Sequence, residues 1–257
     1  MTSPASLFEY SKTAMSESEI ARRIALATQP YPDERRGKPS LARLIGELDL
    51  LVEPARRLTR KLDIPQTRTP QTIIIMPGFA ASPNRMRYLA RNLERAGHTT
   101  KDWGMGRNWG MAEDGMERLE ERLFDVCERY EQSVVLLGWS LGGLYARELA
   151  KRHPICVHKV ITMGSPFSGS PRANNVWRAY QAIAGHRVDE PPIETDLSIK
   201  PPVETVAMWS PLDGAVAARC AAGLEGERDR AIGLRCTHAG FTYRPESILA
   251  VLAELDR

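Results

Sequence analysis

The pattern of hydrophobic and polar positions changes character near residue 70. Beyond that point, short runs rich in β-branched residues alternate with stretches whose apolar positions recur at helical spacing. This alternation predicts βαβ units, and hence an α/β fold with a mostly parallel sheet of about six strands flanked by helices. The predicted strands are 71–76, 98–102, 133–138, 158–163, 203–209 and 232–236, and the predicted helices are 84–96, 112–131, 141–152, 172–184, 214–223 and 245–256.

The first 69 residues are predicted to form a helical arm that precedes a separate domain at 70–257. Ser16 and Glu19 match a capping box, in which each side chain bonds the other residue's backbone N–H, so a short helix is expected to begin there. The segment 31–39 is polar, contains proline and is typical of a linker.

The arm contains a second amphipathic segment at 40–62. Pro54 within it predicts a kink or a new helix start. We expect its apolar face to pack on the main domain or on another subunit, which would make a homo-oligomer; the alternative is an interfacial helix in peripheral contact with a membrane. The face consists of Leu41, Leu44, Ile45, Leu48, Leu51, Ala55, Leu58 and Leu62.

Composition narrows the class of protein. A chain of 257 residues, 42% of them hydrophobic, is long enough to bury a core without metal or disulfide support. Its net charge of +3 is too small to indicate nucleic-acid binding. No apolar run is long enough for a transmembrane helix, and the N-terminus lacks the basic-then-apolar order of a secretory signal, so we expect a cytoplasmic protein.

The strongest chemical motif is Gly138-Trp139-Ser140-Leu141-Gly142, which lies between a predicted apolar strand and a predicted helix. A nucleophile elbow requires this context. The sharp turn needs small flanking residues, which Gly138 and Gly142 supply, and it holds the serine near a helix N-terminus, where negative charge is favoured. Ser140 is therefore the candidate nucleophile, and a plain glycine-rich turn is the alternative.

A serine nucleophile needs a base, and the base needs a carboxylate. Of the five histidines, only His238 follows the predicted final strand and precedes a C-terminal helix. Asp213 follows the predicted strand 203–209 and stands between Ser140 and His238, the order expected for this kind of triad. A loop histidine without a role and an ordinary Asp-Gly turn are the alternatives.

The reaction would also need two N–H donors for the developing oxyanion. One is expected to be the backbone N–H of Leu141, directly after the nucleophile. The other is expected from Phe79, because the loop Met76-Pro77-Gly78-Phe79-Ala80 follows the first predicted strand and Gly78 permits an unusual backbone turn.

Together these motifs resemble the α/β-hydrolase superfamily, and more narrowly its small bacterial lipase and esterase branch. The resemblance covers about residues 70–257 and includes Gly164-Ser165-Pro166-Phe167 after the fourth predicted strand. It implies a compact version of the fold whose sheet begins near residue 71. Two departures stand out: Met76-Pro77 precedes the glycine where many relatives carry a histidine, and no family pattern covers 1–69.

Two segments of the domain are candidates for substrate contact. The segment 104–110 is glycine-rich but fits no phosphate-binding pattern, and similar segments in lipase-like relatives lie beside the active site. The small insertion 172–200 would, by the resemblance, lie over the active site like a cap; a structural turn and a helix packed on the sheet are the alternatives. The candidate substrate-binding residues are Trp109, Trp139, Trp177 and Tyr180.

The four cysteines show no CxxC spacing and no nearby histidine pair, which argues against a zinc site. Cys220 and Cys236 flank the segment that carries the candidate acid and base. A disulfide between them and two buried free thiols both fit the sequence, although a cytoplasmic location favours reduced thiols.

The sequence thus predicts a serine hydrolase that cleaves carboxylic esters, small-molecule or lipid, through an acyl-enzyme on Ser140. No metal or organic cofactor is expected. An acyltransferase or thioesterase with the same triad is one alternative, and a non-catalytic scaffold on a hydrolase fold is another, because fold alone does not fix function.

Overall fold

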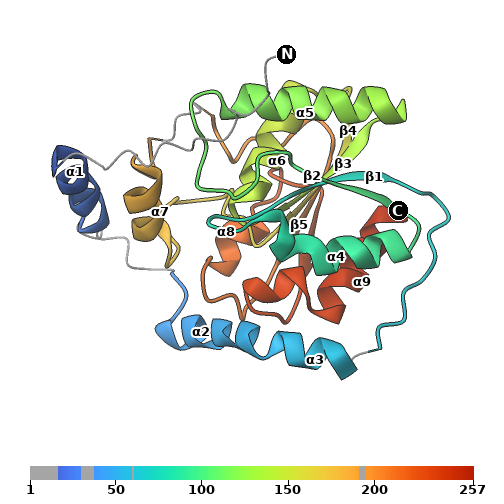
Figure 1. The fold of residues 1–257 in the computed structure, drawn as a ribbon, viewed down its shortest axis with the longest axis horizontal. Coiled ribbons are helices and arrows are strands. Elements are labelled where there is room, and N and C mark those ends of the chain that lie inside the picture. The colour runs from blue at the N-terminus through green and yellow to red at the C-terminus, as the bar shows by residue number, and fades with distance from the viewer. Residues whose placement is uncertain (1–16, 30–37, 60, 191–194) are drawn as a thin grey trace, which may run out of the picture.

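Residues 17–29, 38–59, 61–190 and 195–257 are described in the computed structural model of the chain. Their strands form one parallel sheet of six in the order β2-β1-β3-β4-β5-β6 (Figure 1), which confirms the predicted fold class. The strand β3 is buried along its whole length, as its apolar sequence predicts for a strand covered on both faces. The strands are β1 (Thr72–Met76), β2 (Thr99–Asp102), β3 (Val134–Trp139), β4 (Val157–Met163), β5 (Glu204–Trp209) and β6 (Arg230–Gly233).

Helices cover both faces of the sheet. On one face α4 (Pro83–Arg95) and α9 (Pro245–Leu255) enclose one apolar cluster; on the other, α5 (Gly115–Tyr130) and α6 (Leu141–Arg152) enclose a second. Alternate residues of β1 enter opposite clusters, as the two-residue period of a strand requires. Within the described ranges, none of the helices combines the length and the apolar character needed to cross a bilayer.

The prediction for the last strand is wrong at its C-terminal end, because β6 stops at Gly233 instead of Cys236. The backbone N–H of Leu234 still bonds the carbonyl of Trp209 at 2.8 Å. Beyond Leu234, the Ser210 hydroxyl takes the place of the backbone hydrogen bonds between strands. It donates to the Cys236 carbonyl at 2.6 Å and accepts from the Cys236 N–H at 3.2 Å. Cys236 is therefore buried as a strand residue would be, but side-chain bonds hold it.

The first helix of the arm, α1 (Glu17–Ala27), packs against α7 (Trp177–Ala184) of the insertion, at one end of the molecule (Figure 1). Arg22 and Arg23 donate to carbonyls at the C-terminal end of α7, where helix carbonyls lack partners within the helix. Ser16 of the predicted capping box lies outside the described residues.

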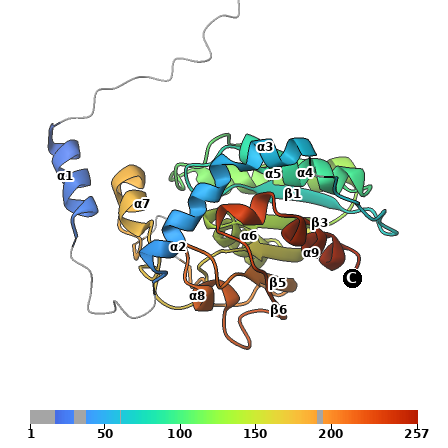
Figure 2. The same ribbon diagram turned by 90° about the horizontal axis from the view of Figure 1, so that it is seen from below.

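The amphipathic segment of the arm forms α2 (Leu41–Gly46), η1 (Glu47–Leu51) and α3 (Glu53–Thr59), with η2 (Ala239–Thr242) beneath η1 and α8 (Ala218–Ala222) following β5. Figure 2 shows this part of the arm running across the domain. Pro54 occupies the first turn of α3, so the predicted new helix start is confirmed.

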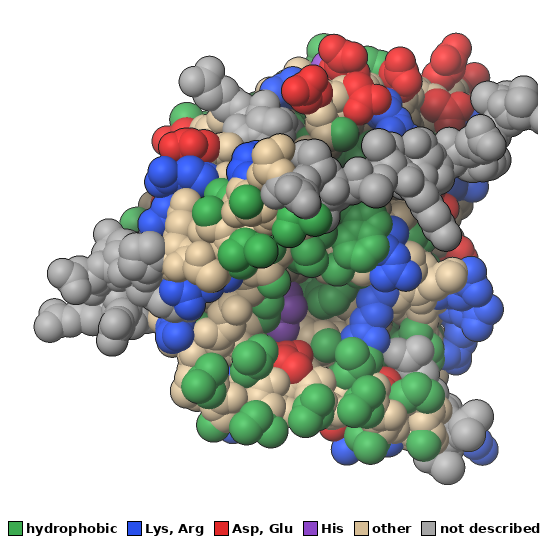
Figure 3. All heavy atoms as spheres, turned by 60° about the vertical axis from the view of Figure 1, so that its left-hand side comes forward, with side chains coloured by type: hydrophobic (Ala, Val, Ile, Leu, Met, Phe, Trp, Pro, Cys, Tyr) green, Lys and Arg blue, Asp and Glu red, His purple; other side chains and the backbone are tan. Residues whose placement is uncertain are grey.

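The expectation that the apolar face of 40–62 packs on the domain holds at Leu62, which packs against a core cluster, but is wrong for residues 41–51. There the face points outward: Leu41, Ile45 and Leu48 are 66%, 66% and 60% exposed. Figure 3 shows hydrophobic side chains gathered along this edge of the molecule. The arm faces the domain with the acidic side chains of Glu47 and Asp49 instead, and Glu53 is also fully buried. Contact of the apolar face with another subunit or with a membrane stays a prediction, as does the division of the chain at residue 70.

Candidate active site

Ser140 sits in a strained turn between β3 and α6. Its φ of +54° and ψ of −122° lie outside the regions that a residue with a Cβ ordinarily occupies. The neighbouring strand β4 stabilises the turn, because the Ser140 N–H donates to the Met163 carbonyl at 2.9 Å. The side chain is only 8% exposed, so the predicted nucleophile stands at the carboxyl edge of the sheet in a protected position.

The glycines around Ser140 are required by close backbone contacts. A Cβ on Gly138 would lie 2.3 Å from the Gly143 Cα, and one on Gly142 would lie 2.3 Å from the Met76 carbonyl oxygen. The predicted reason for Gly138 and Gly142, the close approach of strand and helix, is therefore confirmed. Gly143, which the sequence analysis did not single out, is equally constrained, since its Cβ would meet the Ser165 hydroxyl at 2.0 Å.

The predicted acid and base are in contact. His238 Nδ1 and Asp213 Oδ2 are 2.8 Å apart, and both side chains are buried. The other carboxylate oxygen, Oδ1, accepts the N–H groups of Ala215 and Val216, each at 2.8 Å. These bonds fix the carboxylate, and the Nδ1–H donation to it leaves the Nε2 lone pair of His238 available for a proton.

The charges around His238 favour its protonated form. Burial by itself would lower the pKa of His238, but the nearby charge of Asp213 and its hydrogen bond, together with the Glu47 carboxylate, hold that pKa above its usual value. Arg85 acts in the opposite direction. An imidazole in this field is a stronger base than a free histidine, as the proton acceptor of a serine must be.

The chain brings the predicted nucleophile and the predicted base to the same edge of the sheet. The ring of Trp139, next to Ser140, lies 5.4 Å from the His238 ring, and its Nε1 donates to the His238 carbonyl at 3.0 Å. Among the described residues, hydrogen bonds join Asp213 to His238 but none joins Ser140 to His238. In enzymes without substrate this last contact is often long.

The two predicted oxyanion donors have no competing partner. Within the part of the chain that the structure describes, the backbone N–H groups of Phe79 and Leu141 make no hydrogen bond. Both residues line the same cavity as Ser140. A Cβ on Gly78 would lie 3.0 Å from the Ser140 Cβ, so the loop that carries Phe79 passes directly beside the serine.

Asn108 holds that loop in place. Its side-chain nitrogen donates to the Pro77 carbonyl at 2.7 Å, and its backbone bonds Ala80 and Ala81 at 2.6 and 2.9 Å. Asn108 is fully buried. The sequence analysis missed it, although an asparagine inside the glycine-rich segment 104–110 was a usable signal for a turn-stabilising side chain.

Ser140 opens onto a largely apolar cavity of about 930 Å³, counted with its mouth. Trp177 and Tyr180 from α7 line it, and the Tyr180 ring packs edge-on against Phe79 with 5.1 Å between centroids. Trp139 and Trp109 do not line this cavity: Trp139 packs beside His238, and Trp109 is 47% exposed under the Arg107 guanidinium. Of the four aromatic candidates, the structure therefore brings two to the cavity.

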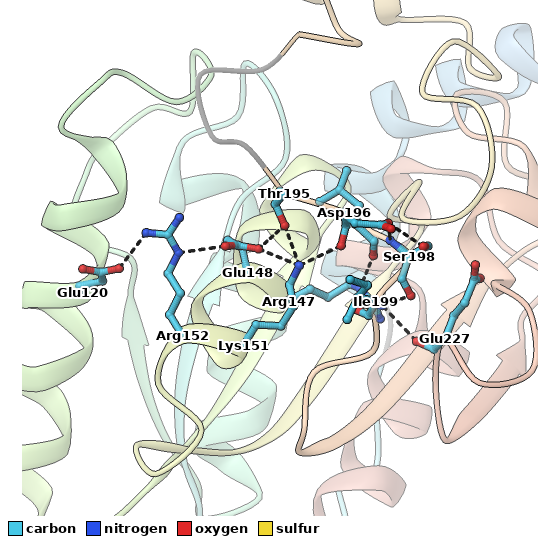
Figure 4. A network of polar contacts seen from close by, with 11 residues as sticks. Glu120, Arg147, Glu148, Lys151, Arg152, Thr195, Asp196, Ser198, Ile199 and Glu227 are labelled. Carbon is cyan, nitrogen blue, oxygen red and sulfur yellow. Dashed lines mark hydrogen bonds and ion pairs between the residues drawn. The ribbon is translucent and has the colours of Figure 1, made fainter.

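The helix α6, which follows Ser140, also anchors the part of the insertion that lines the cavity (Figure 4). Arg147 is fully buried and donates to backbone carbonyls of the insertion and of the segment before β6. Burial lowers its pKa to about 10, so it stays charged at neutral pH. The acceptors are the carbonyls of Leu197 (3.2 Å), Ser198 (3.4 Å), Ile199 (3.2 Å) and Glu227 (3.0 Å).

A second set of bonds from α6 fixes the same wall (Figure 4). Lys151 donates to the Thr195 hydroxyl at 2.6 Å, and Thr195 donates to Glu148. Burial would raise the pKa of Glu148, but bonds from Lys151, Thr195 and Arg152 hold it below its usual value. Leu197 and Thr195 both line the cavity, so the insertion forms one of its walls.

Cys220 and Cys236 are buried free thiols, which settles the alternative that the sequence left open. The described residues contain no cluster of histidine, cysteine and carboxylate side chains that would hold a metal ion.

Comparisons with known proteins agree with this architecture. No protein-family model matches the chain. It is 39% identical over 62 residues to the pimeloyl-[acyl-carrier protein] methyl ester esterase of Klebsiella pneumoniae, and similarly to that of Salmonella agona. The match spans 24% of this chain and about a quarter of the length of these curated relatives.

Solved structures match over a larger part of the chain. One of the metagenome-derived lipolytic enzymes LipS and LipT matches with a TM-score of 0.55 and 16% identity over 74% of this chain and 95% of its own. An α/β-hydrolase enzyme from a lagoon-sediment metagenome matches with a TM-score of 0.52 and 18% identity over 76% of this chain and 97% of its own. With its six-stranded parallel sheet, its strand–turn–helix elbow and these neighbours, the chain has the α/β-hydrolase fold.

Proposed function

We propose that the protein is a carboxylic ester hydrolase with Ser140 as nucleophile, His238 as base and Asp213 as the carboxylate that orients His238. The observation that carries the proposal is the buried Asp213–His238 pair, joined at 2.8 Å at the same edge of the sheet as the strained Ser140 turn. A buried aspartate whose other oxygen is fully occupied by backbone N–H groups suits a group that must orient an imidazole without taking its proton.

In the proposed reaction, His238 Nε2 takes the Ser140 proton as the oxygen attacks the ester carbonyl. The unpartnered N–H groups of Phe79 and Leu141 stabilise the oxyanion of the tetrahedral intermediate, each worth about 3 kcal/mol by analogy with other oxyanion donors. Protonated His238 then gives its proton to the leaving alcohol. Water, activated by the same imidazole, hydrolyses the acyl-enzyme and restores Ser140.

The cavity supports an apolar acyl group as the part of the substrate that is recognised. Its lining is mainly apolar and includes Trp177 and Tyr180 of α7. Each additional buried CH₂ contributes about 0.8 kcal/mol, so kcat/KM should rise about fourfold per methylene until the cavity is full. The structural neighbour described as a lipolytic enzyme fits this proposal.

The test is active-site labelling of the purified protein with a fluorophosphonate, followed by mass spectrometry. We expect one adduct, on Ser140, absent in Ser140→Ala and suppressed in His238→Ala. A p-nitrophenyl ester series of increasing chain length then measures the acyl preference. Well-folded protein that takes no adduct would overturn the proposal in favour of a non-catalytic scaffold.

An acyltransferase or thioesterase remains the second candidate, because it would use the same acyl-enzyme. The partial match bears on this candidate only through the acyl-carrier protein in the relative's name, because the methyl ester esterase activity in the same name is ester hydrolysis. Product analysis with alcohol and thiol acceptors present separates it from hydrolysis: transfer products that exceed the free acid would establish the acyltransferase. Cytoplasmic location and oligomeric state stay predictions.

A further inference from the structure

A carboxylate from the N-terminal arm reaches the backbone of the base and of the residue after the acid. Glu47, the first residue of η1, accepts the N–H of Gly214 at 3.0 Å and the N–H of His238 at 2.7 Å on its Oε1. Its Oε2 accepts the N–H of Ala239 at 2.9 Å. One side chain therefore ties the residue after Asp213 to His238 itself, although 191 positions separate Glu47 from His238.

The arm packs closely against the loop that carries Asp213 and Gly214. A Cβ on Gly214 would lie 2.4 Å from the Arg43 carbonyl oxygen, so only glycine permits this approach. Asn175 joins the two sides, since its Nδ2 bonds the Pro39 carbonyl at 3.0 Å and the Gly214 carbonyl at 2.8 Å. Contacts at Pro39 and Arg43 thus fix the segment that leads into Glu47.

We propose that Glu47 is a positioning residue that sets the relative placement of Asp213 and His238. The inference rests on the proposed function for its catalytic consequence. Hydrogen bonds from N–H groups to a carboxylate are about twice as strong as those to a neutral acceptor. Three of them, shared between two loops, hold the imidazole against the acid at a place where a shift of about 1 Å costs about 100-fold in rate.

Glu47 also contributes charge at the base. The charged groups that face His238 are Asp213 after β5, Glu47 on η1 and Arg85 on α4. Asp213 and Glu47 favour the protonated imidazole, and Arg85 opposes it. Removing the Glu47 charge therefore lowers the pKa of His238, and the acid limb of the pH–rate profile moves to lower pH.

The arm has a second acidic anchor, and it provides a matched control. Asp49 pairs with Arg56 and accepts from Arg244 Nη2 at 2.9 Å and from the Tyr243 hydroxyl at 3.3 Å. These groups hold the arm to the segment after η2 without touching the backbone of Gly214 or His238. Asp49→Asn therefore weakens arm docking but leaves the three Glu47 bonds in place.

The experiment compares Glu47→Ala, Glu47→Gln and Asp49→Asn in the full chain. We expect kcat to fall about 100-fold in Glu47→Ala with little change in KM, since the acyl cavity is untouched. Glu47→Gln keeps one oxygen that can accept two of the three N–H groups. It should therefore retain most of the wild-type kcat. Both Glu47 variants should move the acid limb to lower pH, and Asp49→Asn should change neither kcat nor the limb.

NMR titration of the His238 imidazole supplies a readout that needs no catalysis. The proposal is overturned if Glu47→Gln and Glu47→Ala keep the wild-type kcat and His238 pKa, or if Asp49→Asn loses as much activity as Glu47→Ala. If Glu47→Ala does not fold, the pKa shift in Glu47→Gln still decides. Wild-type protein without a Ser140 adduct would refute the proposed function alone, and the titration would still test the contact.

Discussion

Substituting Gly142 by alanine should disable the oxyanion hole while leaving Ser140, Asp213 and His238 intact. A Cβ at this position would lie 2.3 Å from the Met76 carbonyl oxygen, 2.7 Å from its carbon and 2.7 Å from the Pro77 carbonyl oxygen. All three are backbone atoms at the end of β1, so no flexible side chain can yield. Because ordinary contact begins at about 3.5 Å, α6 must move about 1 Å away from β1.

That displacement separates the two predicted oxyanion donors, since Leu141 begins α6 and Phe79 follows Pro77 in the loop after β1. The loss of one such donor typically costs about 10²–10³ in kcat. Overpacking of this kind also costs about 1–3 kcal/mol of stability. We therefore expect Gly142→Ala to fold with a lowered Tm and to lose at least about 100-fold in kcat.

The assay is kcat on a p-nitrophenyl ester, with the rate of fluorophosphonate labelling as a second measure. Gly46→Ala is the matched control, because a Cβ at Gly46 would meet no atom within 4 Å and its φ is ordinary. We expect that variant to keep the wild-type kcat. A Gly142→Ala protein with kcat within about threefold of wild type would show that this contact does not set the oxyanion geometry.

Three further outcomes follow from the site. Asp213→Asn should lower kcat about 10⁴-fold with little loss of Tm, because an amide oxygen can still accept the Ala215 and Val216 N–H groups; a loss under tenfold would contradict the assigned role. The proposed base is neutral His238, so kcat/KM should fall as pH drops through its raised pKa, with a midpoint above the ordinary value of about 6.5. A midpoint at or below that value would contradict the effect assigned to the charges around His238. Arg147→Met should destabilise the fold by about 3 kcal/mol in chemical denaturation, because it strands buried carbonyls, and a wild-type midpoint would contradict the anchoring of the cavity wall.

The sequence was sufficient to predict the order of strands and helices along the chain and to single out a candidate acid and a candidate base that the structure brings into contact. Each of these rests on a local signal: Ser140 lies in a five-residue motif, and Asp213 and His238 each follow a recognisable strand. Local signals fail where a group distant in the sequence determines where a strand ends. The Ser210 hydroxyl ends β6 earlier than the apolar pattern of 232–236 predicts.

The arm shows a different limit of sequence patterns. An apolar face recurring at helical spacing normally marks the buried side of a helix, yet Leu48 and its neighbours point outward. The reason is that the domain presents backbone N–H groups and the Arg244 guanidinium to η1. The carboxylates of Glu47 and Asp49 are their partners. Periodicity shows that the segment has an apolar face and a polar face. It does not show which of the two faces finds partners on the domain.

The groups that were missed share one physical property. Asn108 holds the oxyanion loop across 31 positions, Arg147 holds the cavity wall across up to 80, and Glu47 holds the acid and base loops across as many as 192. Each is a polar side chain that satisfies backbone groups of a loop from another element, which buried loops require. The reactive residues must belong to particular types because their chemistry demands it, and so they are visible in a sequence. The residues that hold loops need only reach an unpaired N–H or carbonyl, and which one they reach is decided by the folded chain.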